Sequence, residues 1–196
     1  MSRWISDEID FSAYERETEF KAQVRRPGVF ADELDAEFAP RAQGTRRGRM
    51  TSTKLRNAIE FRPSEVTVWA GFNGHRKSMF TGQVALDLIA QGEPVLLVSL
   101  EMLPRKTLYR MCRQATAHDQ PSSERRGEFL RWTDDRLWLF DHVGRLNPKR
   151  CLALCRYFAD ELKGRHVFID SMMKVCESEE SLDEQKQLVG DLCNLG

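Results

Sequence analysis

Short apolar runs alternate with helically patterned stretches from residue 57 to the end of the chain. The apolar runs predict four β-strands, at 66–70, 94–102, 136–143 and 166–170. Apolar residues at helical spacing predict helices over 79–92, 104–117, 147–164 and 181–196, and the polar stretch 118–128 interrupts this order. Strands that alternate with helices indicate βαβ units. We therefore predict an α/β fold with a mostly parallel sheet and helices on both of its faces.

The residues before this pattern divide into two segments. Residues 1–40 are acidic, and their apolar residues have the spacing of two short helices separated by the RRPG at 25–28. Such helices have too little core of their own, so they must dock either on their own domain or on a neighbouring subunit. Residues 41–56 carry basic residues, two glycines and no acid. This range predicts a basic linker, solvated rather than bound to nucleic acid, and the core domain is assigned to 57–196.

Composition narrows the choice of partners and compartment. The 196 residues include 30 Lys and Arg and 30 Asp and Glu, so binding of nucleic acid would need a local basic patch. The five cysteines form no CxxC pair, and Cys151 and Cys155 on one helix face indicate core packing rather than half of a metal site. No signal peptide and no run of about 18 apolar residues is present. A cytoplasmic protein without a membrane partner is expected.

The strongest chemical signal is the stretch GFNGHRKS at 71–78, directly after the first predicted strand. It resembles the phosphate-binding pattern G-x-x-x-x-G-K-[ST], in which backbone N–H groups and the lysine hold phosphates and the hydroxyl holds magnesium. Gly71, Lys77 and Ser78 fit the pattern, whereas Arg76 replaces its second glycine. His75 can touch phosphate or base, although a solvent-facing side chain is the simpler interpretation. The predicted cofactor-binding residues are Gly71, Asn73, Gly74, His75, Arg76, Lys77 and Ser78, and the expected cofactors are ATP and Mg²⁺.

Two acidic residues end predicted strands. Glu101 follows VLLVSL, and Asp170 follows HVFI. Parallel sheets bind ligands beyond the carboxyl ends of their strands, so both acids should lie near the phosphate-binding loop. Asp170 and Ser78 are predicted to hold magnesium. Glu101 and Lys77 are the predicted catalytic residues, with Glu101 orienting or deprotonating the attacking water.

The segment from Glu65 to Leu103, and above all the SLEM at 99–102, resembles the phosphate-loop region of DnaB-type and bacteriophage replicative DNA helicases. The resemblance covers residues 60–196. It implies a RecA-like P-loop ATPase core, with Glu101 as the catalytic glutamate and Asp170, in VFIDSMMKV, as the Walker B aspartate. It also implies assembly into a ring, with a hexamer as the expected size, and movement on single-stranded DNA driven by ATP hydrolysis.

Members of that family continue with a further strand, DNA-binding loops and an arginine finger. We therefore expect a core that is incomplete at its C-terminus and impaired when alone, because an arginine finger contributes on the order of 10³-fold or more. The alternative is a non-hydrolysing interaction module that binds a complete helicase and modulates or blocks it.

Overall fold

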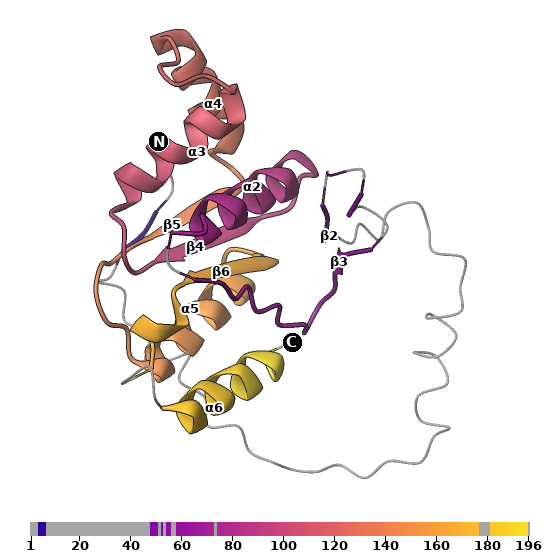
Figure 1. The fold of residues 1–196 in the computed structure, drawn as a ribbon, viewed down its shortest axis with the longest axis vertical. Coiled ribbons are helices and arrows are strands. Elements are labelled where there is room, and N and C mark those ends of the chain that lie inside the picture. Colours follow the sequence, from indigo (N-terminus) through magenta and orange to yellow (C-terminus); the bar gives the residue numbers. More distant parts are fainter. Residues whose placement is uncertain are drawn as a thin grey trace.

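The computed structural model describes residues 4–6, 48–50, 52, 54–55, 58–72, 74–176 and 181–195. Its main sheet is parallel and has the strand order β1-β5-β4-β6 (Figure 1). These strands are β1 (Trp4–Ser6), β4 (Val95–Ser99), β5 (Leu137–Asp141) and β6 (His166–Asp170). The helices around it are α2 (Lys77–Ala90), α3 (Pro104–Thr116), α4 (Ser123–Thr133), α5 (Pro148–Asp160) and α6 (Leu182–Cys193), with a 3-10 turn, η3, at Met172–Lys174.

Helices cover both faces of this small sheet, as the sequence predicts. Alternate residues of β4 face opposite ways, because successive side chains of a strand point to opposite faces. Leu96 and Val98 pack into a cluster with α5 and α6, while Val95 and Leu97 pack into a second cluster with α2, α3 and α4. Figure 1 shows the two groups of helices on either side of the strands. The prediction of an α/β fold with a parallel sheet is thus confirmed.

Local signals place several helix ends correctly. Asn147 caps α5, since its side-chain Oδ1 accepts a 2.8 Å hydrogen bond from the backbone N–H of Lys149, and Pro148 follows in the first turn. Helix α2 begins two residues earlier than predicted, at Lys77. Ser181 occupies the N-cap position of α6.

Helix α4 was not predicted, because its residues fall largely in the polar stretch 118–128. Ser122 caps it by accepting a 3.3 Å hydrogen bond from the N–H of Arg125. Phe129 is its main buried apolar side chain, only 4% exposed. The half-buried Trp132 packs on the same cluster as Phe129, but two apolar positions are too few to establish helical periodicity.

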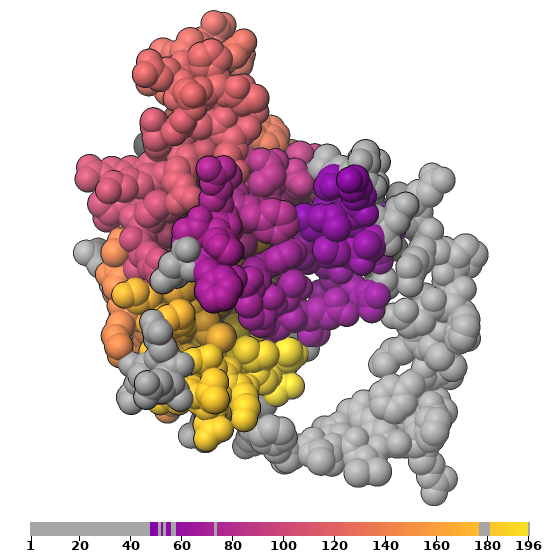
Figure 2. Space-filling model, in the orientation of Figure 1, coloured from indigo at the N-terminus to yellow at the C-terminus, as the bar shows by residue number. Residues whose placement is uncertain are grey.

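The prediction of a strand at 66–70 is wrong, because these residues do not enter the sheet. Strand β4 already pairs with β5 on one side and β6 on the other, so no central position remains. Val68 is 60% exposed, and Trp69 instead packs edge-on against Phe80 with ring centroids 4.9 Å apart. In Figure 2 the residues that lead to α2 lie across the surface of the molecule.

Part of the predicted helical segment 1–40 is also different in the structure. Residues Trp4–Ser6 form β1, which pairs in parallel with β5 at the edge of the sheet. Pairing with a preformed strand outweighs a weak local helical pattern in so short a segment. The rest of 1–40 lies outside the described residues.

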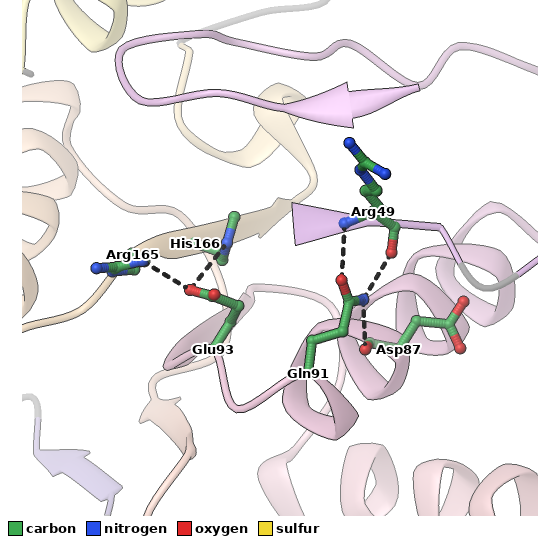
Figure 3. A network of polar contacts seen from close by, with 6 residues as sticks. All are labelled: Arg49, Asp87, Gln91, Glu93, Arg165 and His166. Carbon is green, nitrogen blue, oxygen red and sulfur yellow. Dashed lines mark hydrogen bonds and ion pairs between the residues drawn. The ribbon is translucent and has the colours of Figure 1, made fainter. Parts of the chain in front are cut away.

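A small hairpin packs beside the C-terminal end of α2. Its strands, β2 (Gly48–Arg49) and β3 (Glu60–Phe61), are antiparallel, and Met50 beside β2 is only 3% exposed. The side-chain amide of Gln91 holds β2 in place by pairing with both backbone polar groups of Arg49, as a neighbouring strand would (Figure 3). Its Oε1 accepts a 3.0 Å hydrogen bond from the N–H of Arg49, and its Nε2 donates to the carbonyl of Arg49 at 2.7 Å. Residues 48–50, within the range predicted as a basic linker, therefore lie against the core.

A buried carboxylate lies next to this hairpin at the amino-terminal end of β6. Glu93 is 3% exposed, and its Oε2 lies 3.3 Å from Arg165 Nη1 and 3.8 Å from His166 Nε2 (Figure 3). Burial lowers the pKa of His166, although Glu93 raises it and Arg165 adds to the lowering. A buried charge requires such partners, because an unpaired one would be very costly.

Candidate functional site

The candidate phosphate-binding segment, residues 71–78, forms the loop before α2 and continues into the first turn of that helix. Lys77 is half-buried, and its Nζ donates to the backbone carbonyls of Gly71 and Phe72, the latter at 3.0 Å. A lysine ammonium has three donors and no acceptor, so these carbonyls substitute for the anion that the pattern predicts. The side chain is thus folded back over the loop, across the N-terminus of α2.

Arg76 adopts the left-handed helical conformation, with φ 59° and ψ 28°, at the N-cap of α2. This region disfavours a residue with a Cβ and favours glycine. The structure therefore explains physically why the general pattern has glycine at this position. Arg76 keeps the backbone shape of the loop at a conformational cost, and its side chain is exposed.

The remaining loop residues are accessible from solvent. Gly74 has φ 83°, and a Cβ built on it meets no atom within 4 Å, so its glycine serves the backbone conformation rather than a close approach. The N–H of His75 donates to the carbonyl of Phe72 at 3.3 Å, and the two rings make an edge contact at 5.6 Å. His75 is exposed. Asn73, also predicted to bind the nucleotide, lies outside the described residues.

The ends of β4 and β6 bring the predicted acids to one edge of the sheet. Ser99 and Asp170 are paired residues of the two strands, and the N–H of Leu100 donates to the carbonyl of Asp170 at 2.8 Å. Glu101 follows one residue later and is exposed. The parallel register of β4 and β6 thus places both strand ends at the same edge of the sheet.

Ser171 connects the two strand ends through its side chain. Its Oγ donates a 2.9 Å hydrogen bond to Oε1 of Glu101. Sequence reasoning missed Ser171, although a hydroxyl directly after the strand-end Asp170 is a signal that could have found it. The bond restricts the orientation of a carboxylate that is otherwise exposed to solvent.

A depression lies between α2, α3 and the ends of β4 and β6. Ser78 and Asp170 both line it, so the structure brings together the two predicted magnesium ligands. One hydroxyl and one carboxylate fit magnesium, which normally keeps several waters and binds substrate phosphates besides one or two protein ligands. Other polar residues that line it are Thr81, Ser99, Thr107, Arg110 and Gln114.

Sequence analysis did not single out Ser99, Thr107 or Arg110. Ser99 precedes Glu101 in the SLEM motif, and the other two lie one helical turn apart on α3. Thr107 and Arg110 reach this depression only through the packing of α3 against α2, which no local pattern encodes, whereas Ser99 is the strand-end residue that opens the SLEM motif.

Neither a scan of protein-family models nor a search of curated proteins finds a match to this chain. Within the described residues, no helix is both long and apolar enough to cross a membrane. Over the same residues, no three side chains of His, Cys, Asp or Glu gather into a metal-binding group. A magnesium ion here would thus depend on phosphate and water oxygens, as described above for Ser78 and Asp170.

Proposed function

We propose that residues 57–196 form a magnesium-dependent ATPase domain, the RecA-like motor of a phage-type replicative DNA helicase. The observation that carries the proposal is the convergence of Ser78, at the start of α2, with Asp170, at the end of β6, on one depression. Glu101 lies at the same edge of the sheet, held by Ser171. A P-loop lysine and serine, a strand-end aspartate and a second carboxylate are the groups that phosphoryl transfer to water requires.

Each side chain has a role that follows from its chemistry. The N–H groups and positive end of the α2 dipole attract phosphate, and Lys77 would exchange its loop carbonyls for phosphate oxygens. Ser78 and Asp170 would hold magnesium, which neutralises charge on the transferring phosphoryl group. Glu101 would orient and deprotonate the attacking water, with its carboxylate restricted by the hydroxyl of Ser171.

The helicase assignment depends on the SLEM motif at 99–102 and its resemblance to replicative helicases. In that proposal the domain acts on single-stranded DNA as a homo-oligomeric ring. Charge balance over the whole chain is zero, so DNA contact would come from a local surface rather than a general positive field.

A second candidate is a non-hydrolysing module that binds a complete helicase. It is favoured by the position of residues 66–70 on the surface, since a loop without its supporting strand is less rigidly placed. Binding to a helicase would then survive loss of the lysine.

The deciding experiment measures ATP hydrolysis with magnesium, with and without single-stranded DNA, for wild type and Lys77→Ala. Lys149→Ala serves as the control, because Lys149 is exposed on α5, on the opposite face of the sheet. The motor proposal predicts DNA-stimulated hydrolysis that is lost only in Lys77→Ala. Absence of stimulation at every protein concentration would exclude it, and helicase binding unchanged by Lys77→Ala would support the interaction module.

A further inference from the structure

Two buried hydroxyl groups beside the candidate magnesium ligands have no hydrogen-bond partner. Ser99 and Thr107 are 9% and 8% exposed, and neither Ser99 Oγ nor Thr107 Oγ1 makes a hydrogen bond. Both residues line the depression that Ser78 and Asp170 also line. Buried polar groups are normally paired, so two such hydroxyls in one depression are available to donate to a ligand that enters it.

Arg110 adds a positive charge to the same wall. It is half-buried, and its Nη1 donates to the thioether sulfur of Met102 at 3.1 Å. A thioether is a weak acceptor for a group with five donors. Arg110 makes no ion pair with any described carboxylate, so its charge is available to an anion that enters the depression.

We propose that Ser99, Thr107 and Arg110 form a subsite for the terminal phosphoryl group of the bound nucleoside triphosphate. The inference rests on the proposed ATPase function and deepens it. All three side chains can donate, and a phosphoryl group offers three acceptor oxygens. Neither hydroxyl makes a hydrogen bond within the described residues, so both are available as donors. Arg110 and the two hydroxyls are then positioned to distinguish a triphosphate from a diphosphate.

The neighbouring carboxylate gives the subsite a specific requirement. Asp170 lines the same depression and would repel a bare phosphoryl group. A divalent cation between them removes this repulsion. The preference for triphosphate over diphosphate should therefore depend on magnesium.

The test is calorimetric binding of ATPγS and of ADP, each with magnesium, to wild type, Arg110→Ala and the double variant Ser99→Ala/Thr107→Val. Valine keeps the shape of threonine, and Arg105→Ala is the control, because Arg105 is an exposed arginine of α3 outside the depression. The proposal predicts that both test variants lose about tenfold or more of the wild-type preference for ATPγS. Their affinity for ADP should stay unchanged, as should both affinities of Arg105→Ala.

Urea denaturation of the nucleotide-free double variant shows whether a loss of binding comes from misfolding. Removal of an unpartnered buried hydroxyl should leave the nucleotide-free double variant at least as resistant to urea as wild type. A preference for ATPγS that equals the wild-type value in both variants overturns the subsite and leaves the ATPase proposal standing. Failure of wild type to bind either nucleotide overturns both.

Discussion

Ser171 Oγ donates a 2.9 Å hydrogen bond to Glu101 Oε1, and so joins the residue after β6 to the loop after β4. The neighbouring bond from the N–H of Leu100 to the carbonyl of Asp170 fixes the backbone below it. The carboxylate proposed to activate water is therefore oriented by the same strand that supplies the proposed magnesium ligand. Movement of β6 relative to β4 would disturb both groups together.

Replacement of Ser171 by alanine should lower the rate of ATP hydrolysis without changing nucleotide affinity. Glu101 would keep its charge but lose its fixed orientation, so the loss should be on the order of tenfold, a part of the 10²–10⁴ that a general base contributes. Steady-state kinetics would show this as lower kcat with unchanged KM. Ser171→Thr, which retains the hydroxyl, is the control, and a wild-type kcat in Ser171→Ala would show that the bond has no role in turnover.

Arg76→Gly should increase nucleotide affinity. Glycine removes the Arg76 side chain from the loop that the phosphates approach. It also relieves a backbone cost of about 1–2 kcal/mol, which should increase the free energy of unfolding rather than the affinity, because the nucleotide-free loop already has the left-handed conformation. Arg76→Ala separates the two effects, because alanine removes the guanidinium but keeps the strained Cβ. Calorimetry on the three proteins would measure this directly. Equal or weaker binding by Arg76→Gly would show that Arg76 does not obstruct the loop.

Acid should destabilise the protein through His166. Burial lowers the pKa of this histidine in the folded state, so the unfolded chain binds a proton first as the pH falls. The free energy of unfolding is unaffected by this group well above about 6.5, the ordinary histidine pKa, and decreases as the pH falls through that value.

Urea denaturation between about pH 7.5 and pH 5.5 would reveal this dependence. His166→Asn should flatten the decrease, whereas substitution of the exposed His118 in the same way should leave it as in wild type. An identical slope in His166→Asn and wild type would mean that another group is responsible.

The core of the fold was predictable because its signals are local. The continuous apolar runs of β4, β5 and β6 are the pattern expected for strands buried in a parallel sheet. Asn147 followed by Pro148 is a local signal for the start of a helix, and α5 begins there. The run at 66–70 carries the same kind of signal, but a strand also needs a partner edge. The two edges of β4 are taken by β5 and β6, and the run at 66–70 does not pair with the outer edge of β6 either.

The candidate site was predictable only in part, because some of its residues are brought together by tertiary packing rather than by a local motif. Ser78 and Asp170 follow from the motif and from the rule that ligands bind at strand ends. The left-handed conformation of Arg76 agrees with the glycine that the motif requires there. The orphaned hydroxyl of Thr107 depends on how α3 packs against α2, which no local pattern encodes.

The most direct test of the account is calorimetric binding of ATP, with and without magnesium, to wild type and Lys77→Ala, with Lys149→Ala as control. The account predicts magnesium-dependent binding by wild type and Lys149→Ala. It predicts a loss of about tenfold or more in Lys77→Ala, because a charged hydrogen bond to phosphate contributes roughly 1.5–3 kcal/mol. Failure of wild type to bind ATP, or equal binding by Lys77→Ala, would contradict the assignment of residues 71–78 as a nucleotide-binding loop.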